Sequence, residues 1–225
     1  MGWKASCILI SERDPLHLGK MPTHNQERAR RMISDLGLGR FRSRGMTTFD
    51  EGIYPETLVI GAYEGAAIIG HPSVVKSCLE PRADPLTARI LSVFPQAAVL
   101  RIGLHSVVNL WSYAYFERGR MLRAYGGSAD DGVVLDQGDL LAEEQPHFER
   151  SVVRNGQRFF YKEIHGRIEE FDSSAFGESL VFEVMSRFIG CRVDRVAEDV
   201  HPTELPMERF ERVSGRRWWR LFPKR

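Results

Sequence analysis

Two short stretches of this sequence carry residue types that could act in acid–base chemistry. His105 is followed by Ser106 where a predicted strand ends, and Glu163, Ile164 and His165 follow one another in another predicted strand. Alternate side chains of a strand share a face, so the carboxylate of Glu163 is expected beside the imidazole of His165. A base with an orienting carboxylate suits general-base or nucleophilic catalysis. No G-x-S-x-G motif accompanies the serine, and such a His–Glu pair is more often an ordinary surface pair.

Arginines form a second set of candidates. Gly37 is expected to end a helix rather than to bind a dinucleotide, because the dinucleotide motif follows a strand and needs a third glycine. Beyond it, Arg40, Arg42 and Arg44 stand at alternate positions. An extended chain sets these three guanidinium groups on one face, which suits phosphates or carboxylates. Pairing with the acidic middle of the chain is the alternative.

The closing stretch GRRWWRLFPKR is the third candidate. In a helix, Trp218 lies on the apolar side, Arg216, Arg217 and Arg220 lie on the other, and Trp219 lies at the border. Apolar residues also recur every three positions upstream, which extends the expected terminal helix to the whole segment: Met207, Phe210 and Val213. We expect this helix to dock on its own domain or in a homodimer. An anionic membrane surface or nucleic acid is the alternative partner.

Composition limits the class of protein. The chain has 225 residues, 43% hydrophobic and 27% charged, which is typical of a globular protein with a substantial core. It has no apolar run long enough to span a membrane and no signal peptide pattern. Its three cysteines are odd in number and widely spaced, which favours a reducing compartment and predicts a cytoplasmic protein.

The charge is unevenly distributed although the net charge is only +1. Residues 1–49 hold nine Lys/Arg and four Asp/Glu, residues 50–199 hold fifteen and twenty-three, and residues 200–225 hold seven and three. The basic ends either pack against the acidic middle or, if they lie on the same side, form an anion-facing patch. The sequence leaves both arrangements open.

The pattern of elements predicts an α+β fold with a largely antiparallel or mixed sheet built from hairpins. Three turns predict hairpins: Glu64-Gly65, Arg118-Gly119 and Asn155-Gly156. About three helices are expected to pack on the sheet: one after a Thr23–Gln26 capping box, one opened by Asp84-Pro85, and one near residues 175–189, besides the terminal amphipathic segment. The last of the three carries a predicted Glu183–Arg187 pair on its polar face.

One domain is expected over residues 1–225, because no linker rich in Gly, Pro or Ser divides the chain. The order of strands and hairpins also suggests an internal duplication of residues 5–70 and 97–126. Cysteines and histidines do not fall into metal-ligand spacing, so neither a metal nor a cofactor is predicted. His71 and His201 each precede a proline and are interpreted as exposed or capping groups without a role.

Two short motifs resemble a known family. Met1-Gly2-Trp3-Lys4-Ala5 before an apolar strand, and Phe176-Gly177-Glu178 at the start of the late helix, resemble a family of uncharacterised bacterial proteins, a domain of unknown function. The resemblance is confined to these motifs. It implies a bacterial cytosolic protein and supplies no site.

The leading hypothesis from sequence is therefore a non-catalytic binding or interaction module for an unidentified protein or small molecule. Two alternatives remain. One is an enzyme of hydrolase type that uses His105, Glu163 and His165, and the other is a peripheral membrane or polyanion binder that uses the basic-aromatic end.

Overall fold

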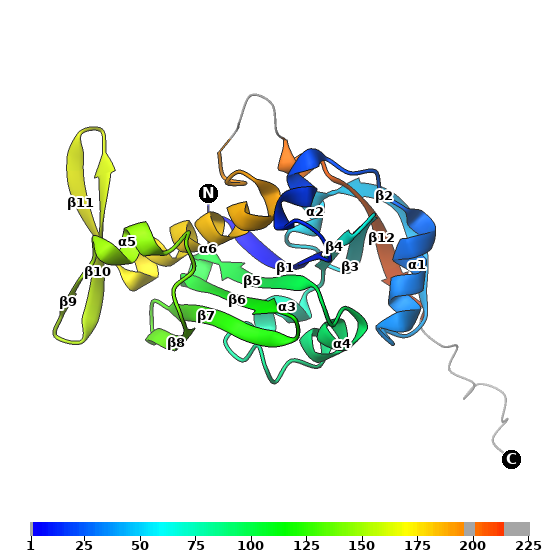
Figure 1. Ribbon diagram of the computed structural model, residues 1–225, viewed down its shortest axis with the longest axis horizontal. Helices are drawn as coiled ribbons and strands as arrows, with labels where there is room; N and C mark the ends of the chain where they lie inside the picture. The colour runs from blue at the N-terminus through cyan, green and yellow to red at the C-terminus, as the bar shows by residue number, and fades with distance from the viewer. Residues whose placement is uncertain (1, 196–200, 214–225) are drawn as a thin grey trace, which may run out of the picture.

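The computed structural model describes residues 2–195 and 201–213, and its largest feature is a nine-stranded sheet (Figure 1). Its order is β2-β12-β3-β4-β1-β5-β6-β7-β8, and all neighbouring pairs are antiparallel. The strands are β1 (Lys4–Ser11), β2 (Phe41–Thr48), β3 (Leu58–Tyr63), β4 (Ala66–Gly70), β5 (Ala98–His105), β6 (Leu110–Glu117), β7 (Arg120–Ser128), β8 (Gly132–Gly138) and β12 (Pro206–Arg212). The predicted α+β class is confirmed.

Helices cover both faces of the sheet. The longer ones are α1 (Gln26–Asp35), α4 (Pro85–Val93) and α6 (Ser173–Ile189). Shorter helical turns connect the strands: α2 (Phe49–Gly52), α3 (Ser73–Lys76), α5 (Gln145–Glu149), and the 3₁₀ turns at Pro15–Lys20, Ser106–Val108 and Pro202–Glu204. None of the helices in the described ranges is long and apolar enough to cross a membrane.

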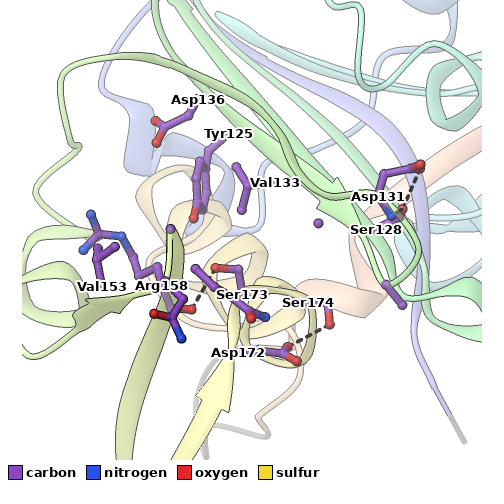
Figure 2. A pocket seen from close by; sticks show the side chains of 15 residues that line it. Tyr125, Ser128, Asp131, Val133, Asp136, Val153, Arg158, Asp172, Ser173 and Ser174 are labelled. Atoms are coloured by element: carbon purple, nitrogen blue, oxygen red, sulfur yellow. Dashed lines mark hydrogen bonds between the residues drawn. The ribbon is translucent and has the colours of Figure 1, made fainter.

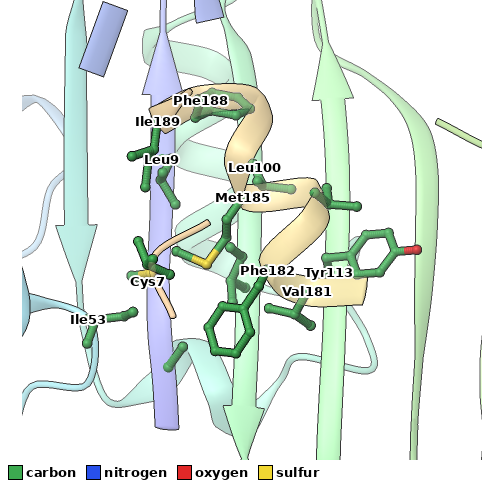
Figure 3. Close-up of a cluster of buried hydrophobic side chains, with 14 of the residues drawn as sticks. Cys7, Leu9, Ile53, Leu100, Tyr113, Val181, Phe182, Met185, Phe188 and Ile189 are labelled. Carbon is green, nitrogen blue, oxygen red and sulfur yellow. The ribbon is translucent and has the colours of Figure 1, made fainter. Parts of the chain in front are cut away.

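The central strand β1 contributes side chains to two separate hydrophobic cores. Cys7 and Leu9 pack in the core beneath α6, which Figure 3 shows lying across the strands. Ile8 and Ile10 point to the opposite face, where α1 and α4 supply the packing residues. Alternate side chains leave a strand on opposite sides, so a strand covered on both faces buries successive residues, which are mostly apolar. This explains the unbroken apolar run at the start of the sequence.

Local turn chemistry fixes the hairpins where the sequence predicted them. Asn155 and Gly156 both have positive φ, +53° and +78°, as a two-residue hairpin turn requires. Gly65 and Gly119 likewise have positive φ in the turns of β3–β4 and β6–β7. Asp84 accepts the N–H of Thr87 at the start of α4, as predicted. The predicted capping box of α1 is wrong, because Asn25 rather than Thr23 accepts a backbone N–H, from Arg28 at 2.9 Å.

The helix predicted near residues 175–189 is α6. Asp172 caps it by accepting the N–H of Ala175 at 2.8 Å, and Gly190 ends it with a φ of +85°. The Glu183–Arg187 pair predicted on its polar face is wrong. Neighbouring segments supply better partners: Arg192 bonds Glu183 at 2.5 Å, and Glu143 accepts from Arg187 at 2.9 Å.

The predicted terminal helix over Met207, Phe210 and Val213 is also wrong, since residues 206–212 form β12 between β2 and β3. Met207 packs in the core beneath α6, and Phe210 packs in the core on the other face. Two residues three apart in a strand point to opposite faces, and here both faces are buried. The spacing that resembled a helix therefore comes from a doubly covered strand.

A separate three-stranded sheet projects from the β8 end of the molecule (Figure 1). We call this sheet the arm; it consists of β9 (Val152–Arg154), β10 (Gln157–Ile164) and β11 (Arg167–Asp172). At its base the ring of Phe160 stacks on Phe176 of α6, with ring centroids 4.5 Å apart. The arm is thus attached to the sheet through α6.

β2 and β12, which come from the first and the last of the described segments, are neighbours at one edge of the large sheet. Most of the basic residues at the C-terminal end, from Arg216 onward, lie outside the described residues, so the anion-facing patch stays a prediction. The suggested internal duplication also stays a prediction, as does the single domain. β1 lies beside the second strand of hairpin β3–β4, whereas β5 lies beside the first strand of hairpin β6–β7.

Candidate functional site

The residues proposed for acid–base chemistry lie in different places. His105 ends β5, half-buried, with its ring 6.0 Å from that of Tyr54. Glu163 is exposed on β10 of the arm. His165 lies in the two-residue turn between β10 and β11 with a φ of +51°, so the prediction that it shares a strand face with Glu163 is wrong. In the described part of the chain, no hydrogen bond or ion pair joins these three residues.

The alternating arginines lie at the β2 edge, and two of them have an acidic partner. Arg42 and Arg44 are exposed and both donate to the carboxylate of Glu211 on β12, at 2.9 Å and 2.6 Å. The carbonyl of Arg40 accepts the N–H of Val213 at 2.8 Å. The partner carboxylate thus comes from the C-terminal strand rather than from the acidic middle. The other predicted binding residues, Arg216, Arg217, Trp218, Trp219 and Arg220, lie outside the described residues.

A cavity of about 430 Å³ lies close to these arginines, where the ends of α1, β2, β3, β4 and β12 meet the start of α4. We call it the basic pocket. Its apolar lining consists of Leu38, Phe41, Leu58, Pro85 and Leu86. Its polar lining consists of His71, Ser73, Asp84, Arg89 and Arg212. An apolar floor with a few convergent polar groups is the usual composition of a small-molecule site.

The two guanidinium groups of the basic pocket are held by main-chain oxygens. Arg89 donates to the carbonyls of Leu36 and Gly37 at 3.1 Å and 2.8 Å, which caps the end of α1. Arg212 donates to the carbonyl of Leu38 at 3.3 Å and lies over the ring of Phe41. Within the described ranges neither arginine forms an ion pair. An anion in this cavity would meet both guanidinium groups.

His71 and Ser73 form a short-range pair in the wall of the basic pocket. The Oγ of Ser73 lies 2.7 Å from Nδ1 of His71, and the backbone N–H of Ser73 donates to the same nitrogen at 3.2 Å. Burial, followed by the charges of Arg212 and Lys76, lowers the pKa of His71, although Asp84 opposes this. His71 is therefore neutral at neutral pH.

A buried polar network fixes the wall behind this pair. Asp84 accepts from the N–H and the hydroxyl of Thr87, both at 2.8 Å, and from the hydroxyl of Ser77 at 3.0 Å. Arg101, which is 1% exposed, donates to the carbonyls of Val74 and Ser77 at 2.7 Å and 2.6 Å. These bonds tie α3 and the start of α4 to the central strand β5, so the pocket wall is formed without a ligand.

A second hollow, of about 530 Å³, lies between β8, the arm and the start of α6 (Figure 2). Three aspartates line it, and each accepts from a protein donor: Asp131 from Ser128 at 2.9 Å, Asp136 from Arg123 at 2.5 Å, and Asp172 from Ser174 at 2.7 Å. These carboxylates therefore stabilise the local fold. Among the described residues, no group of three or more His, Cys, Asp or Glu is placed to hold a metal ion.

Comparison with known proteins adds a family. A family model matches residues 5–210. The chain belongs to the family of unknown function DUF6928. No curated protein and no solved structure matches it.

The family assignment confirms the resemblance to a domain of unknown function, and the structure shows what one of the two motifs does. Phe176 stacks on Phe160 of the arm, and Gly177 lies directly against the indole of Trp111 in β6. Sequence reasoning missed His71 and Ser73, because the contacts that make them a site come from residues distant in the chain. The only signal was that Ser73 follows His71-Pro72 at the entry of a short helix.

Proposed function

We propose that this chain is a binding module of the bacterial cytosol that takes a small organic anion with an apolar body in the basic pocket. One observation carries the proposal: Arg89 and Arg212 line the same cavity, together with several apolar side chains. Neither arginine has a carboxylate partner among the described residues. The three cysteines, Cys7, Cys78 and Cys191, are all free, which supports a reducing compartment. An enzyme based on His105, Glu163 and His165 has no comparable support.

Binding would combine two contributions. The anionic group would receive charge-assisted hydrogen bonds from the guanidinium groups, which contribute about 1.5–3 kcal/mol each. The apolar body would cover Phe41, Leu58 and Leu86 and displace water from them. Neither contribution alone is specific, but their combination favours an aryl or alkyl carboxylate, sulfonate or phosphate over inorganic ions.

Isothermal titration calorimetry with 2-naphthoate tests the proposal. Arg89→Gln and Arg212→Gln should each weaken binding roughly tenfold or more. Arg120→Gln is the matched control, because Arg120 is exposed on β7 and does not line the pocket. Thermal unfolding must show that each variant is folded. The proposal would be contradicted if the wild type did not bind 2-naphthoate, or if both pocket variants bound it as tightly as the Arg120→Gln control.

A further inference from the structure

We propose that Ser73 is a nucleophile, and that the basic pocket accepts an acyl group from esters whose acid part carries a second, negatively charged group. This inference rests on the anion site proposed above and adds a covalent step to it.

The Ser73–His71 pair has the geometry of a nucleophile and its base. The backbone N–H of Ser73 points at Nδ1 of His71, so this nitrogen carries a lone pair and the ring proton is on Nε2. The hydroxyl of Ser73, 2.7 Å from the same nitrogen, therefore donates to it. A hydroxyl that donates to an unprotonated imidazole in a cavity wall can lose its proton as it attacks.

The main chain around the pair is fixed. The N–H of His71 donates to the carbonyl of Ser6 at 3.1 Å, and the hydroxyl of Ser6 donates to the carbonyl of His71 at 2.7 Å. Arg101 holds the next turn through the carbonyls of Val74 and Ser77. The nucleophile and the base are thus positioned before a substrate arrives, which lowers the entropic cost of the reaction.

The surroundings of Ser73 select the class of ester. Arg89 and Arg212 line the same cavity and would hold a free carboxylate of the substrate. Leu58 and Leu86 supply an apolar surface for the carbon chain between that carboxylate and the ester. A half-ester of a dicarboxylic acid meets both requirements, whereas a neutral ester lacks the carboxylate for the two arginines.

The reaction needs only water as a co-reactant. Oγ of Ser73 attacks the ester carbonyl carbon while its proton passes to Nδ1 of His71. The bond to the leaving alcohol breaks, and the alcohol takes the proton from His71. Water then attacks the acyl-serine by the same proton route, which releases the dicarboxylic acid and restores Ser73.

The reaction should be slow. The N–H groups of Val74 and Val75 are occupied by the carbonyl of His71 and the hydroxyl of Ser6, so the first turn of α3 offers the developing oxyanion no free donor there. The amide at Nδ1 also makes His71 a weaker base. We therefore expect an acyl-enzyme that accumulates rather than rapid turnover.

The test uses mono-p-nitrophenyl glutarate, with p-nitrophenyl acetate as the neutral comparison. Wild-type protein should gain one glutaryl group, located on Ser73 by peptide mass spectrometry, and should react roughly tenfold faster with the glutarate ester. Ser73→Ala should not be labelled, Ser73→Cys should be labelled, and Arg212→Gln should lose the preference for the anionic ester. Ser92→Ala, at an exposed position on α4, is the matched control.

Three results would overturn the inference: no label on the folded wild type, a label on another residue, or equal labelling of Ser73→Ala. If Ser73→Ala does not fold, His71→Gln replaces it and should label much more slowly. Calorimetry with 2-naphthoate on the same wild-type preparation separates the two proposals. If 2-naphthoate binds but Ser73 is not labelled, the anion site is supported and the nucleophile is refuted. If Ser73 is labelled but the protein shows no preference for the anionic ester and does not bind 2-naphthoate, the anion site is refuted.

Discussion

Arg123 and Glu144 form an ion pair inside the protein: Nε lies 3.0 Å from Oε1, and the side chains are 1% and 0% exposed. The hydroxyl of Tyr113 donates to the same carboxylate at 2.5 Å, and the N–H of Leu141 donates to it at 2.8 Å. Burial and the charge of Glu144 raise the pKa of Tyr113 well above its ordinary value, so the phenol stays protonated and remains a donor. The pair ties β6 and β7 to the segment that leads into the arm.

Removing one partner of this pair should destabilise the fold strongly. Glu144→Ala leaves Arg123 with Asp136 as its remaining acidic partner and takes the acceptor from Tyr113 and Leu141, so we expect it to lower the free energy of unfolding by about 3 kcal/mol. Glu149→Ala, at an exposed position on α5, is the control and should change it by less than about 0.5 kcal/mol. Urea unfolding followed by circular dichroism measures both. A loss below about 1 kcal/mol for Glu144→Ala would mean that Asp136 alone is enough to compensate the buried guanidinium.

The contact between Gly177 and Trp111 gives the second stability prediction. A Cβ on residue 177 would overlap the indole atoms Cγ, Cδ2 and Cε2, because α6 lies directly on β6 there. Alanine is normally the better helix residue by about 1 kcal/mol, yet overpacking of this kind costs about 1–3 kcal/mol. Gly177→Ala should therefore lower the melting temperature, and tryptophan fluorescence should report the displaced ring.

Ala175→Gly is the matched control for that variant, since Ala175 is exposed in the first turn of the same helix. It should cost only the ordinary helix propensity, up to about 1 kcal/mol, and leave the fluorescence unchanged. A Gly177→Ala protein that is more stable than the wild type would show that α6 can move away from β6 at little cost.

Local signals in the sequence predicted much of this fold. The turns at Glu64-Gly65, Arg118-Gly119 and Asn155-Gly156 depend on residues that are adjacent in the chain, and each forms the expected hairpin. The helix stop at Gly190 is equally local. The strand β12 was misread because its apolar residues face two different cores, and only the pairing of distant segments shows that both faces are covered.

The candidate site was beyond the reach of sequence reasoning for the same reason. The basic pocket draws on segments near residues 37–41, 71–73, 84–89 and 212, whose meeting depends on the strand order. The sequence places His71 before a proline and indicates only an exposed or capping group, because the neighbours that line the pocket with it are distant in the chain. The predicted anion-binding arginines Arg40, Arg42 and Arg44 lie at the same edge of the sheet as the basic pocket, but they do not line it.

The protonation of His71 gives the last prediction, because binding and acylation should respond to pH in opposite directions. Burial, followed by the charges of Arg212 and Lys76, lowers the pKa of His71 below its ordinary value of 6.5, against the opposing charge of Asp84. Arg89 lines the same pocket. As the pH falls through that pKa, His71 gains a positive charge.

The affinity for 2-naphthoate should rise when His71 is charged, while labelling of Ser73 should slow because Nδ1 no longer has a free lone pair. Calorimetry and labelling rates between about pH 4.5 and pH 8, on both sides of the ordinary histidine pKa, measure the two trends on one preparation, and His71→Gln should flatten both. If labelling instead accelerates as the pH falls, His71 does not act as the base. If the affinity for 2-naphthoate falls as the pH falls, His71 does not face the anion.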